Sequence, residues 1–385
     1  MSKVVKRLEP FAETIFAKMT ARAVDCGAIN LGQGFPDSDG PAEMLEIAQR
    51  EIAGGNNQYG PGRGMLELRE AIARQRARDY GVSYDPATEV FITVGATEAI
   101  SATVLGLVEP GSEVIVLEPY YDAYAAAIAL AGARRKAVPL AVDGDTWTID
   151  IDAVRAAITA ETSMIIVNSP HNPTGAVFSR DVLVELAELV VERDLLVLSD
   201  EVYENLVFDN IAHTALASLP GMFERTVTVS SAAKTFNVTG WKTGWALAPA
   251  ELLDGVIKAK QFMSYVGATP FQPAVAWALD NASDWLTGMV QELSDNRDVL
   301  SAALRNAGFS VHSTAGTYFT VADLPAGSDG MQFCWDLPAS AGVAAIPVEA
   351  FVDQPEQWSH QVRFAFCKKP DTMRLAAERI NQLSL

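Results

Sequence analysis

Residues 163–203 read SMIIVNSPHNPTGAVFSRDVLVELAELVVERDLLVLSDEVY and contain the pattern of a strand, a helix and a second strand. The runs at 163–170 and 195–200 are short, apolar and rich in β-branched residues, which is typical of strands. Between them, residues 179–194 have the apolar spacing of a helix, with Ser179 placed as its N-cap. A helix that joins two strands in this way predicts that the strands are parallel and belong to one sheet.

The same alternation of strands and helices extends on both sides of this unit, from about residue 90 to residue 249. A further helix is expected at 96–108. Further strands are expected at 90–94, 113–119, 226–231 and 244–249. The fold class is therefore α/β, with a mainly parallel sheet and crossover helices.

The pattern changes after Pro273. A long amphipathic helix at about 285–306 is followed by a strand pair around YFTVADL and VRFAFC and by a terminal helix from Asp371. These elements predict a smaller α+β domain, and the Gly/Pro stretch LGQGFPD after Asn30 is expected to cross between the domains. A chain of 385 residues exceeds what one core usually organises. We therefore expect a large domain of residues 39–273 and a small domain of residues 1–38 and 274–385.

Composition and charge exclude several classes of protein. Hydrophobic residues make up 49% of the chain and charged residues 20%, which is typical of a globular protein. The 48 acidic and 29 basic residues give a formal charge of −19, so nucleic acids and anionic membranes are not expected as partners. No apolar run approaches the ~18 residues of a membrane span. Cys26, Cys334 and Cys367 are far apart, without the spacing of a metal site, and predict free thiols, no metal and a cytoplasmic location.

Two loops at the ends of predicted strands present groups that could bind a ligand. At Gly95-Ala96-Thr97 a helix begins directly after a strand, and its free N–H groups and the Thr97 hydroxyl favour an anion. The alternative is an ordinary strand-to-helix turn. In NSPHNPTG, at 168–175, two prolines hold Asn168 and Asn172 at a strand end, which suits hydrogen bonds to a ligand. The alternative there is a simple Asx turn.

Three charged side chains stand in apolar surroundings. Asp200 ends the apolar run LLVLSD and needs a partner, for which a cationic ring nitrogen would serve. Lys234 follows TVTVSS among small neutral residues, where desolvation would lower its pKa as a Schiff-base amine requires. Arg363 is the one cation in the strand VRFAF, and its planar fork suits a substrate carboxylate. A structural lysine and an internal salt bridge are the respective alternatives for Lys234 and Arg363.

Eight fragments, in this order, resemble the fold type I aminotransferases of class I/II. The likeness is greatest to the branch that contains the kynurenine and glutamine aminotransferases and the actinobacterial N-succinyldiaminopimelate aminotransferases. It covers nearly the whole chain and implies a fold type I transferase that depends on pyridoxal 5′-phosphate. The fragments are LGQGFPD, NQYGPGRG, TVGATEAI, EPYYDAY, NSPHNPTG, SDEVYE, SSAAKTFNVTGWKTGW and VRFAFCK.

The resemblance implies roles for individual residues in catalysis and in cofactor binding. Lys234 matches the lysine that holds the cofactor and shuttles the proton between substrate Cα and cofactor C4′. Asp200 matches the partner of the pyridinium nitrogen, while Tyr203 and Asn172, with Asn168 nearby, match the donors to the ring's 3′ oxygen. Tyr121 matches the aromatic that stacks on the ring. The phosphate site would comprise Gly95, Ala96, Thr97, Ser231 and Lys242.

The resemblance also implies a substrate site and a partner subunit. Arg363 matches the residue that binds the substrate's α-carboxylate, and Gly32 and Asn172 match positions beside it. Tyr59 matches a tyrosine that reaches the phosphate of the neighbouring subunit, which implies a homodimer with shared active sites. Aspartate aminotransferases carry a distal arginine where this chain has Ser264, which argues against a short acidic donor.

The reaction implied by the resemblance is ping-pong transamination, with 2-oxoglutarate as the expected acceptor. The favoured donor is N-succinyl-LL-2,6-diaminopimelate of lysine biosynthesis, with kynurenine, glutamine and methionine as alternatives. Arg63 is a candidate for a distal carboxylate of the donor, and the alternative is a solvated loop arginine of no consequence, as exposed cations often are. A cysteine-conjugate β-lyase would use the same residues. Regulators that fuse this fold to a DNA-binding module are disfavoured by the acidic charge and by the short segment ahead of LGQGFPD.

Overall fold

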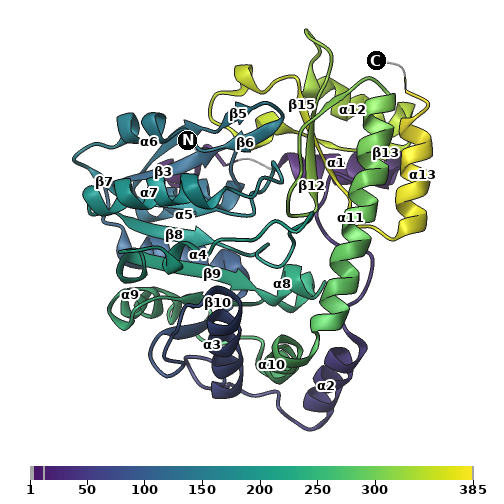
Figure 1. Cartoon of the computed structure of the whole chain (residues 1–385). Coiled ribbons are helices and arrows are strands. Elements are labelled where there is room, and N and C mark those ends of the chain that lie inside the picture. Colours follow the sequence, from purple (N-terminus) through teal and green to yellow (C-terminus); the bar gives the residue numbers. More distant parts are fainter. Residues whose placement is uncertain (1–3, 12–13, 384–385) are drawn as a thin grey trace.

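The protein, seen here as a computed structural model of residues 4–11 and 14–383, is built on a seven-stranded sheet (Figure 1). Five of its strands follow one another as parallel neighbours in the order β9, β8, β7, β3 and β4. The whole order is β2 (Val90–Val94), β10 (Thr243–Leu247), β9 (Thr226–Ser231), β8 (Leu196–Asp200), β7 (Thr162–Asn168), β3 (Glu113–Glu118) and β4 (Arg134–Pro139). The predicted α/β class with a mainly parallel sheet is confirmed.

Two strands of this sheet differ from what the sequence predicted. β10 runs antiparallel to both β9 and β2, because residues 232–242 return the chain along the same edge of the sheet. That connection is shorter than the dozen or more residues that a parallel crossover needs. β4 has the sequence RRKAVP and was not predicted, because it lies at the edge of the sheet, where charged side chains reach solvent.

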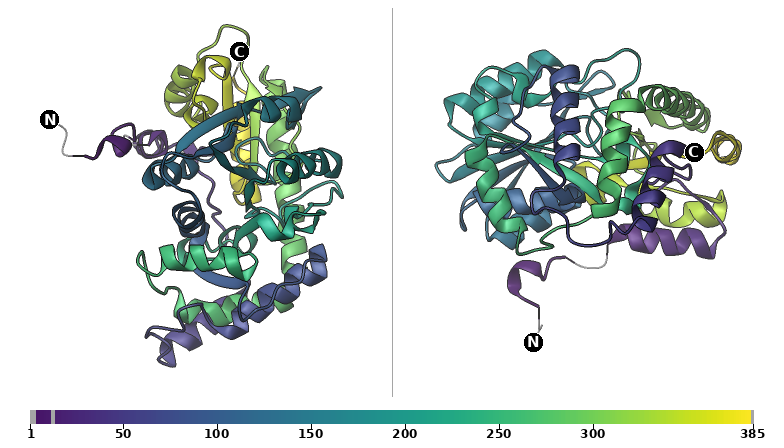
Figure 2. Two further views of the ribbon diagram at one scale, coloured as in Figure 1. Left: turned by 90° about the vertical axis from the view of Figure 1, so that its left-hand side faces the viewer. Right: turned by 90° about the horizontal axis from the view of Figure 1, so that it is seen from below.

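Helices cover both faces of the sheet (Figure 2). Neighbouring residues of β3 point to opposite faces, so Val114 and Val116 join one core while Ile115 and Leu117 join another. The first core is closed by α4 (Gly95–Leu107), α5 (Asp122–Ala131) and α9 (Ala250–Lys260). The other face is covered by α6 (Ile151–Ala157), α7 (Arg180–Glu192), α2 (Ala42–Ala53), α3 (Leu66–Tyr80) and α10 (Gln272–Asn281). Ser179 caps α7 as predicted, since its side chain accepts a hydrogen bond from the Val182 amide.

A second, antiparallel sheet is formed by β11 (Ser310–Val311), β12 (Phe319–Asp323), β15 (Gln361–Ala365) and β14 (Ile346–Pro347). It packs with α11 (Ser283–Asn306), α12 (Gly330–Ser340) and α13 (Pro370–Ile380). The N-terminal helix α1 (Ile15–Asp25) joins the same core, and β1 (Ile29–Asn30) pairs in parallel with β13 (Val343–Ala344). The N-terminal helix and the C-terminal elements therefore share one core.

The domain limits at 38/39 and 273/274 stay a prediction, and residues 1–3, 12–13 and 384–385 of the predicted small domain lie outside the described residues. In the part of the chain that the structure describes, no helix has the length and apolar composition to cross a membrane. Cys26, Cys334 and Cys367 are free thiols.

Candidate active site

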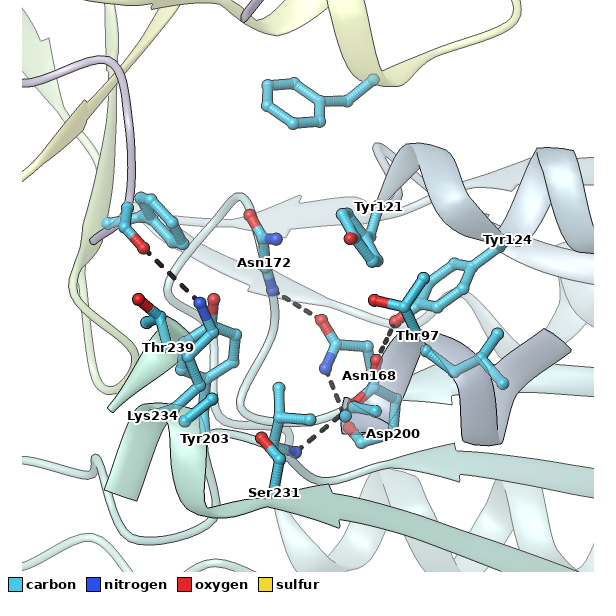
Figure 3. Close-up of a pocket in the computed structure, with 18 of the residues that line it drawn as sticks. Thr97, Tyr121, Tyr124, Asn168, Asn172, Asp200, Tyr203, Ser231, Lys234 and Thr239 are labelled. Carbon is cyan, nitrogen blue, oxygen red and sulfur yellow. Dashed lines mark hydrogen bonds between the residues drawn. The ribbon is translucent and has the colours of Figure 1, made fainter. Parts of the chain in front are cut away.

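A cavity opens where the parallel strands end (Figure 3). β7 ends at Asn168, β8 at Asp200 and β9 at Ser231, while α4 begins directly after β2. The carboxyl ends of parallel strands meet at one edge, so these residues converge although they are far apart in sequence. The cavity brings together the predicted residues Gly95, Ala96, Thr97, Tyr121, Asn168, Asn172, Asp200, Tyr203, Ser231, Lys234, Lys242 and Arg363.

Lys234 lies in α8 (Ala232–Thr235), directly after β9, and keeps part of its surface open to the cavity. Its Nζ donates to the Tyr318 hydroxyl at 2.8 Å, and that hydroxyl donates to the Gly34 carbonyl at 2.6 Å. Desolvation lowers the pKa of Lys234 to about 8. The amine is therefore held in place and is far more nucleophilic at neutral pH than an ordinary lysine.

Asp200 is buried at the end of β8, with 3% of its surface exposed. Its carboxylate accepts hydrogen bonds from the Tyr124 hydroxyl at 2.6 Å and from the Val202 amide at 3.3 Å. Burial outweighs these bonds and raises the pKa of Asp200 to about 6. A cationic ligand group beside this carboxylate would restore the charge balance that burial disturbs.

The two asparagines of the NSPHNPTG loop link Asp200 to Arg363. Asn168 donates to the Asp200 carbonyl at 2.8 Å and accepts from the Asn172 amide at 2.7 Å. The Asn172 side chain in turn accepts from Arg363 Nη1 at 3.0 Å, and the Gly32 carbonyl accepts from Nη2 at 2.6 Å. Gly32 thus lies beside the cavity through its bond to Arg363.

Arg363 is buried in an aromatic enclosure. Its Cζ lies 4.0 Å from the ring centre of Phe319, 4.7 Å from that of Phe351 and 5.5 Å from that of Phe16. Burial lowers the pKa of Arg363 to about 10, and its Nε has no hydrogen-bond partner among the described residues. A buried guanidinium with a free donor and no carboxylate bonded to it is ready for a carboxylate ligand.

The turn between β2 and α4 forms a narrow cradle beside Lys242. Gly95 adopts φ +76°, and a Cβ at that position would lie 3.2 Å from Lys242 Nζ. A Cβ on Gly244 would lie 2.5 Å from the Gly95 carbonyl carbon. Only glycines allow this close approach, which leaves the first amides of α4, the Thr97 hydroxyl and the Lys242 ammonium around one space. Such a site fits a phosphate group.

Three residues considered from the sequence, Tyr59, Arg63 and Ser264, do not line the cavity of their own chain. Tyr59 is 81% exposed and packs edge-on against Tyr265, with ring centres 5.5 Å apart. Arg63 donates to the Thr88 carbonyl at 3.2 Å and does not line the cavity. Ser264 is exposed.

The structure adds site residues that the sequence patterns did not reveal. Tyr318 and Tyr124 bond Lys234 and Asp200, and Phe16, Phe319 and Phe351 enclose Arg363. Tyr124 could have been found, since it follows Tyr121 by one helical turn in YYDAY. The others come from segments that reach the cavity only through the second sheet, so their local sequence carries no signal.

Buried charges behind Asp200 were also missed. Arg76 has no exposed surface and bonds Glu201 at 2.6 Å and also Glu204. Burial alone would raise the pKa of Glu201, but Arg76 and His213 lower it to about 2.

Among residues 4–11 and 14–383, no group of three or more His, Cys, Asp and Glu side chains could hold a metal ion.

The layered α/β fold, with a low-pKa lysine, a buried carboxylate and an anion cradle at the strand ends, defines a transferase of the fold type I class. Comparison with known proteins gives the family. A profile described as "Aminotransferase class I and II" matches residues 27–380. The chain belongs to this aminotransferase family, whose members depend on pyridoxal 5′-phosphate.

Individual relatives resemble the chain over almost its whole length. The "Probable N-succinyldiaminopimelate aminotransferase DapC" of Mycobacterium tuberculosis is 55% identical, covering 99% of this chain and 98% of the relative. The structure of N-succinyldiaminopimelate aminotransferase from that organism matches with a TM-score of 0.96 at 56% identity, over 98% of this chain and 99% of that one. The methionine aminotransferase of Escherichia coli is 38% identical, over 98% and 97% of the two chains. The mouse kynurenine–oxoglutarate transaminase 3 is 36% identical, over 98% and 89%.

The lowered pKa of Lys234 predicts how the reactivity of its amine depends on pH. The unprotonated fraction should rise about tenfold per pH unit up to pH ~8 and then level off, whereas an ordinary lysine would continue to gain up to pH ~10.4. Timed labelling of the cofactor-free protein with a small amine-specific reagent, followed by mass spectrometry of the Lys234 peptide, measures this. The exposed Lys258 provides the comparison in the same sample. A reactivity of Lys234 that still rises about tenfold between about pH 9 and pH 10 would contradict a pKa lowered by burial.

Proposed function

We propose that this aminotransferase holds pyridoxal 5′-phosphate in the cavity and moves the amino group of N-succinyl-LL-2,6-diaminopimelate to 2-oxoglutarate. The observation that supports it is one cavity with two separate cationic sites, Lys242 beside Gly95 and Arg363 beside Asn172, together with Lys234 and Asp200. When bound, the cofactor supplies an electron sink and carries the amino group.

The residues present suit each part of the cofactor. The first amides of α4, Thr97, Ser231 and Lys242 would bind the phosphate. Asp200 would face the ring nitrogen and keep it protonated, which explains why a carboxylate is buried there. Tyr121 would stack on the ring. Asn172 and Tyr203, with Asn168 nearby, would bond the ring's 3′ oxygen.

The remaining groups would orient the amino acid and move its proton. Arg363 would bind the α-carboxylate, while Gly32 and Asn172 hold the guanidinium in place. Lys234 would take the proton from the substrate's Cα and deliver it to C4′ of the cofactor. Its low pKa suits a base at neutral pH, and the Tyr318 hydroxyl fixes the position of the amine.

The site would be completed in a homodimer. Tyr59, Phe262, Met263 and Tyr265 are exposed large side chains, and such a patch is typical of a protein interface. Tyr59 would reach the phosphate bound by a second copy of the chain. The free thiols of all three cysteines fit a protein of the reducing cytoplasm.

The donor is inferred from likeness to the mycobacterial relative, whose name states N-succinyldiaminopimelate. Its identity of 55% exceeds the 38% and 36% of the relatives named for methionine and kynurenine. The donor should therefore be selected by pocket walls that this chain and the mycobacterial enzyme share.

A panel of amino donors tests the assignment. With 2-oxoglutarate as acceptor, N-succinyl-LL-2,6-diaminopimelate should give a kcat/KM about tenfold or more above those of methionine, kynurenine and glutamine. Glutamate formation with and without added pyridoxal 5′-phosphate is measured. A higher kcat/KM for methionine or kynurenine would overturn the donor, and pyruvate released from a cysteine conjugate without any acceptor would indicate a β-lyase.

Asp200→Asn should lower turnover without preventing cofactor binding, because the phosphate site and Lys234 remain. Losing a buried charge partner costs about 3–5 kcal/mol, which is on the order of 10² to 10³ or more in rate if it is expressed in the transition state. Steady-state kcat and the visible absorbance of the bound cofactor separate the two effects. Asp194→Asn, at an exposed site, is the control. Turnover within a few-fold of the parent would remove Asp200 from the ring nitrogen.

Beyond the α-carboxylate at the reacting carbon the donor carries two further carboxylates, which need cationic partners. Within one chain, the arginines and lysines that line the cavity are Arg363, Lys234 and Lys242 in the described residues. Arg63, on the loop after Tyr59, would then supply one such contact across the dimer. Arg63→Ala should raise KM for the succinylated donor and leave that for methionine nearly unchanged, whereas Arg363→Ala should impair both. Equal effects on the two donors would exclude Arg63 from the specificity pocket.

A further inference from the structure

A segment of the second sheet returns to the seven-stranded sheet beside the cavity. It runs between β14 and β15 and contains two short 3₁₀ turns, η6 (Val348–Phe351) and η7 (Pro355–Gln357). Phe351 is 1% exposed, lines the cavity and lies over Arg363. It also packs edge-on against Phe16, with ring centres 5.4 Å apart. The position of this segment therefore decides how well Arg363 is covered.

Asp353, two residues beyond Phe351, is fastened to the large sheet by several bonds. Arg135 of β4 donates from Nε at 2.9 Å and from Nη2 at 2.6 Å, one bond to each carboxylate oxygen. The Tyr120 hydroxyl donates to the same carboxylate, and the Asp353 amide donates to the Glu118 carboxylate. The Tyr120 amide donates to the Phe351 carbonyl at 2.8 Å. We call Arg135, Tyr120 and Asp353 the clamp.

The clamp has features that ordinary surface ion pairs lack. Its guanidinium and carboxylate are only 28% and 29% exposed and meet through two parallel bonds, a geometry that gives strength and direction. Arg135 also lies over the Tyr120 ring, 5.5 Å from its centre. Burial alone would raise the pKa of Asp353, but the bonds from Arg135 and Tyr120 keep that pKa below its usual value. Asp353 is therefore ionised throughout the neutral range.

The two ends of the clamp lead to residues that line the cavity. Tyr120 directly precedes Tyr121, and Asp353 follows Phe351. A second contact anchors the same segment further on, because Trp358 stacks on Trp147 with ring centres 5.6 Å apart. If the clamp opens, Phe351 can move away from Arg363 while Trp358 still holds the far end of the segment.

We propose that Arg135, Tyr120 and Asp353 are positioning residues that keep Phe351 over Arg363 and thereby set the affinity for the substrate's α-carboxylate. The ring excludes water from the guanidinium, and the attraction between Arg363 and a carboxylate is stronger in the absence of water. The proposal rests on the proposed function, in which Arg363 binds that carboxylate.

Asp353→Asn tests the clamp, since it removes the charge and keeps the shape. Hydrogen exchange of the cofactor-free protein should become faster in residues 348–354. In the holoenzyme, KM for the amino donor at saturating 2-oxoglutarate should rise about tenfold while kcat stays within about twofold. Tyr120→Phe should give a smaller rise in KM. Asp280→Asn is the matched control, because Asp280 pairs with Arg74 at the same 2.6 Å distance and lies away from the cavity.

A double-mutant cycle isolates the pair. Arg135→Met combined with Asp353→Asn should raise KM no further than either change alone, and Arg135→Lys should retain part of the parent affinity. Unchanged exchange in residues 348–354, or an unchanged KM, would overturn the proposal. So would equal effects of Asp353→Asn and Asp280→Asn. Because hydrogen exchange needs no substrate, its result separates failure of the clamp from failure of the proposed function, which would appear as no glutamate from any donor.

Discussion

The structure depends on how acidic groups are accommodated at the buried end of β8. Asp200, Glu201 and Glu204 fall within five positions of one another, and each is at most 3% exposed. Arg76 of α3 bonds the two glutamates and is itself fully buried, so removing it would leave both without their shared cation at a cost of about 3–5 kcal/mol. This network ties α3 to the sheet and fixes the backbone from which Asp200 enters the cavity. Asp200 alone among the three remains directed toward a ligand.

The same apolar surroundings shift the pKa values of the acid and the base of the site in opposite directions. Burial raises the pKa of Asp200 to about 6 and lowers that of Lys234 to about 8. Both values come to lie near neutral pH without a specific ion pair between the two side chains. Tyr124 and Tyr318 orient these groups with neutral hydroxyls, and the bond from Tyr124 opposes the rise in the pKa of Asp200 without cancelling it.

Most of the large sheet and the strand-end residues could be predicted, for a physical reason. Apolar β-branched runs mark the buried strands, and parallel strands deliver their last residues to one edge, so Asn168, Asp200 and Ser231 were expected together. The edge strand β4 was not predicted, because its charged residues do not give the apolar pattern of a buried strand. The antiparallel β10 could have been recognised only from the length of the connection that carries Lys234.

The rest of the site depends on tertiary packing that no local pattern records. Phe16, Phe319 and Phe351 are ordinary aromatic residues in their own segments, and they reach the cavity only because the second sheet docks there. Arg363 was recognised by its isolation among aromatics, but its bond to Gly32 joins positions 331 residues apart. Tyr59 and Arg63 do not line the cavity of their own chain, and the roles proposed for them need a second chain.

The pairing of β1 with β13 has a consequence for the order in which parts of the protein can fold during synthesis. Ile29 and Asn30 are synthesised long before their partners Val343 and Ala344. At ~5–20 residues per second, the N-terminal helix waits many seconds for its core while the large sheet is already able to form. During that interval the side chains of Met19 and Phe16 lack the core of the second sheet that later covers them. The part of the cavity that Arg363 lines is thus assembled only after translation of β15, and a chain arrested before it would carry Lys234 and the anion cradle but no Arg363.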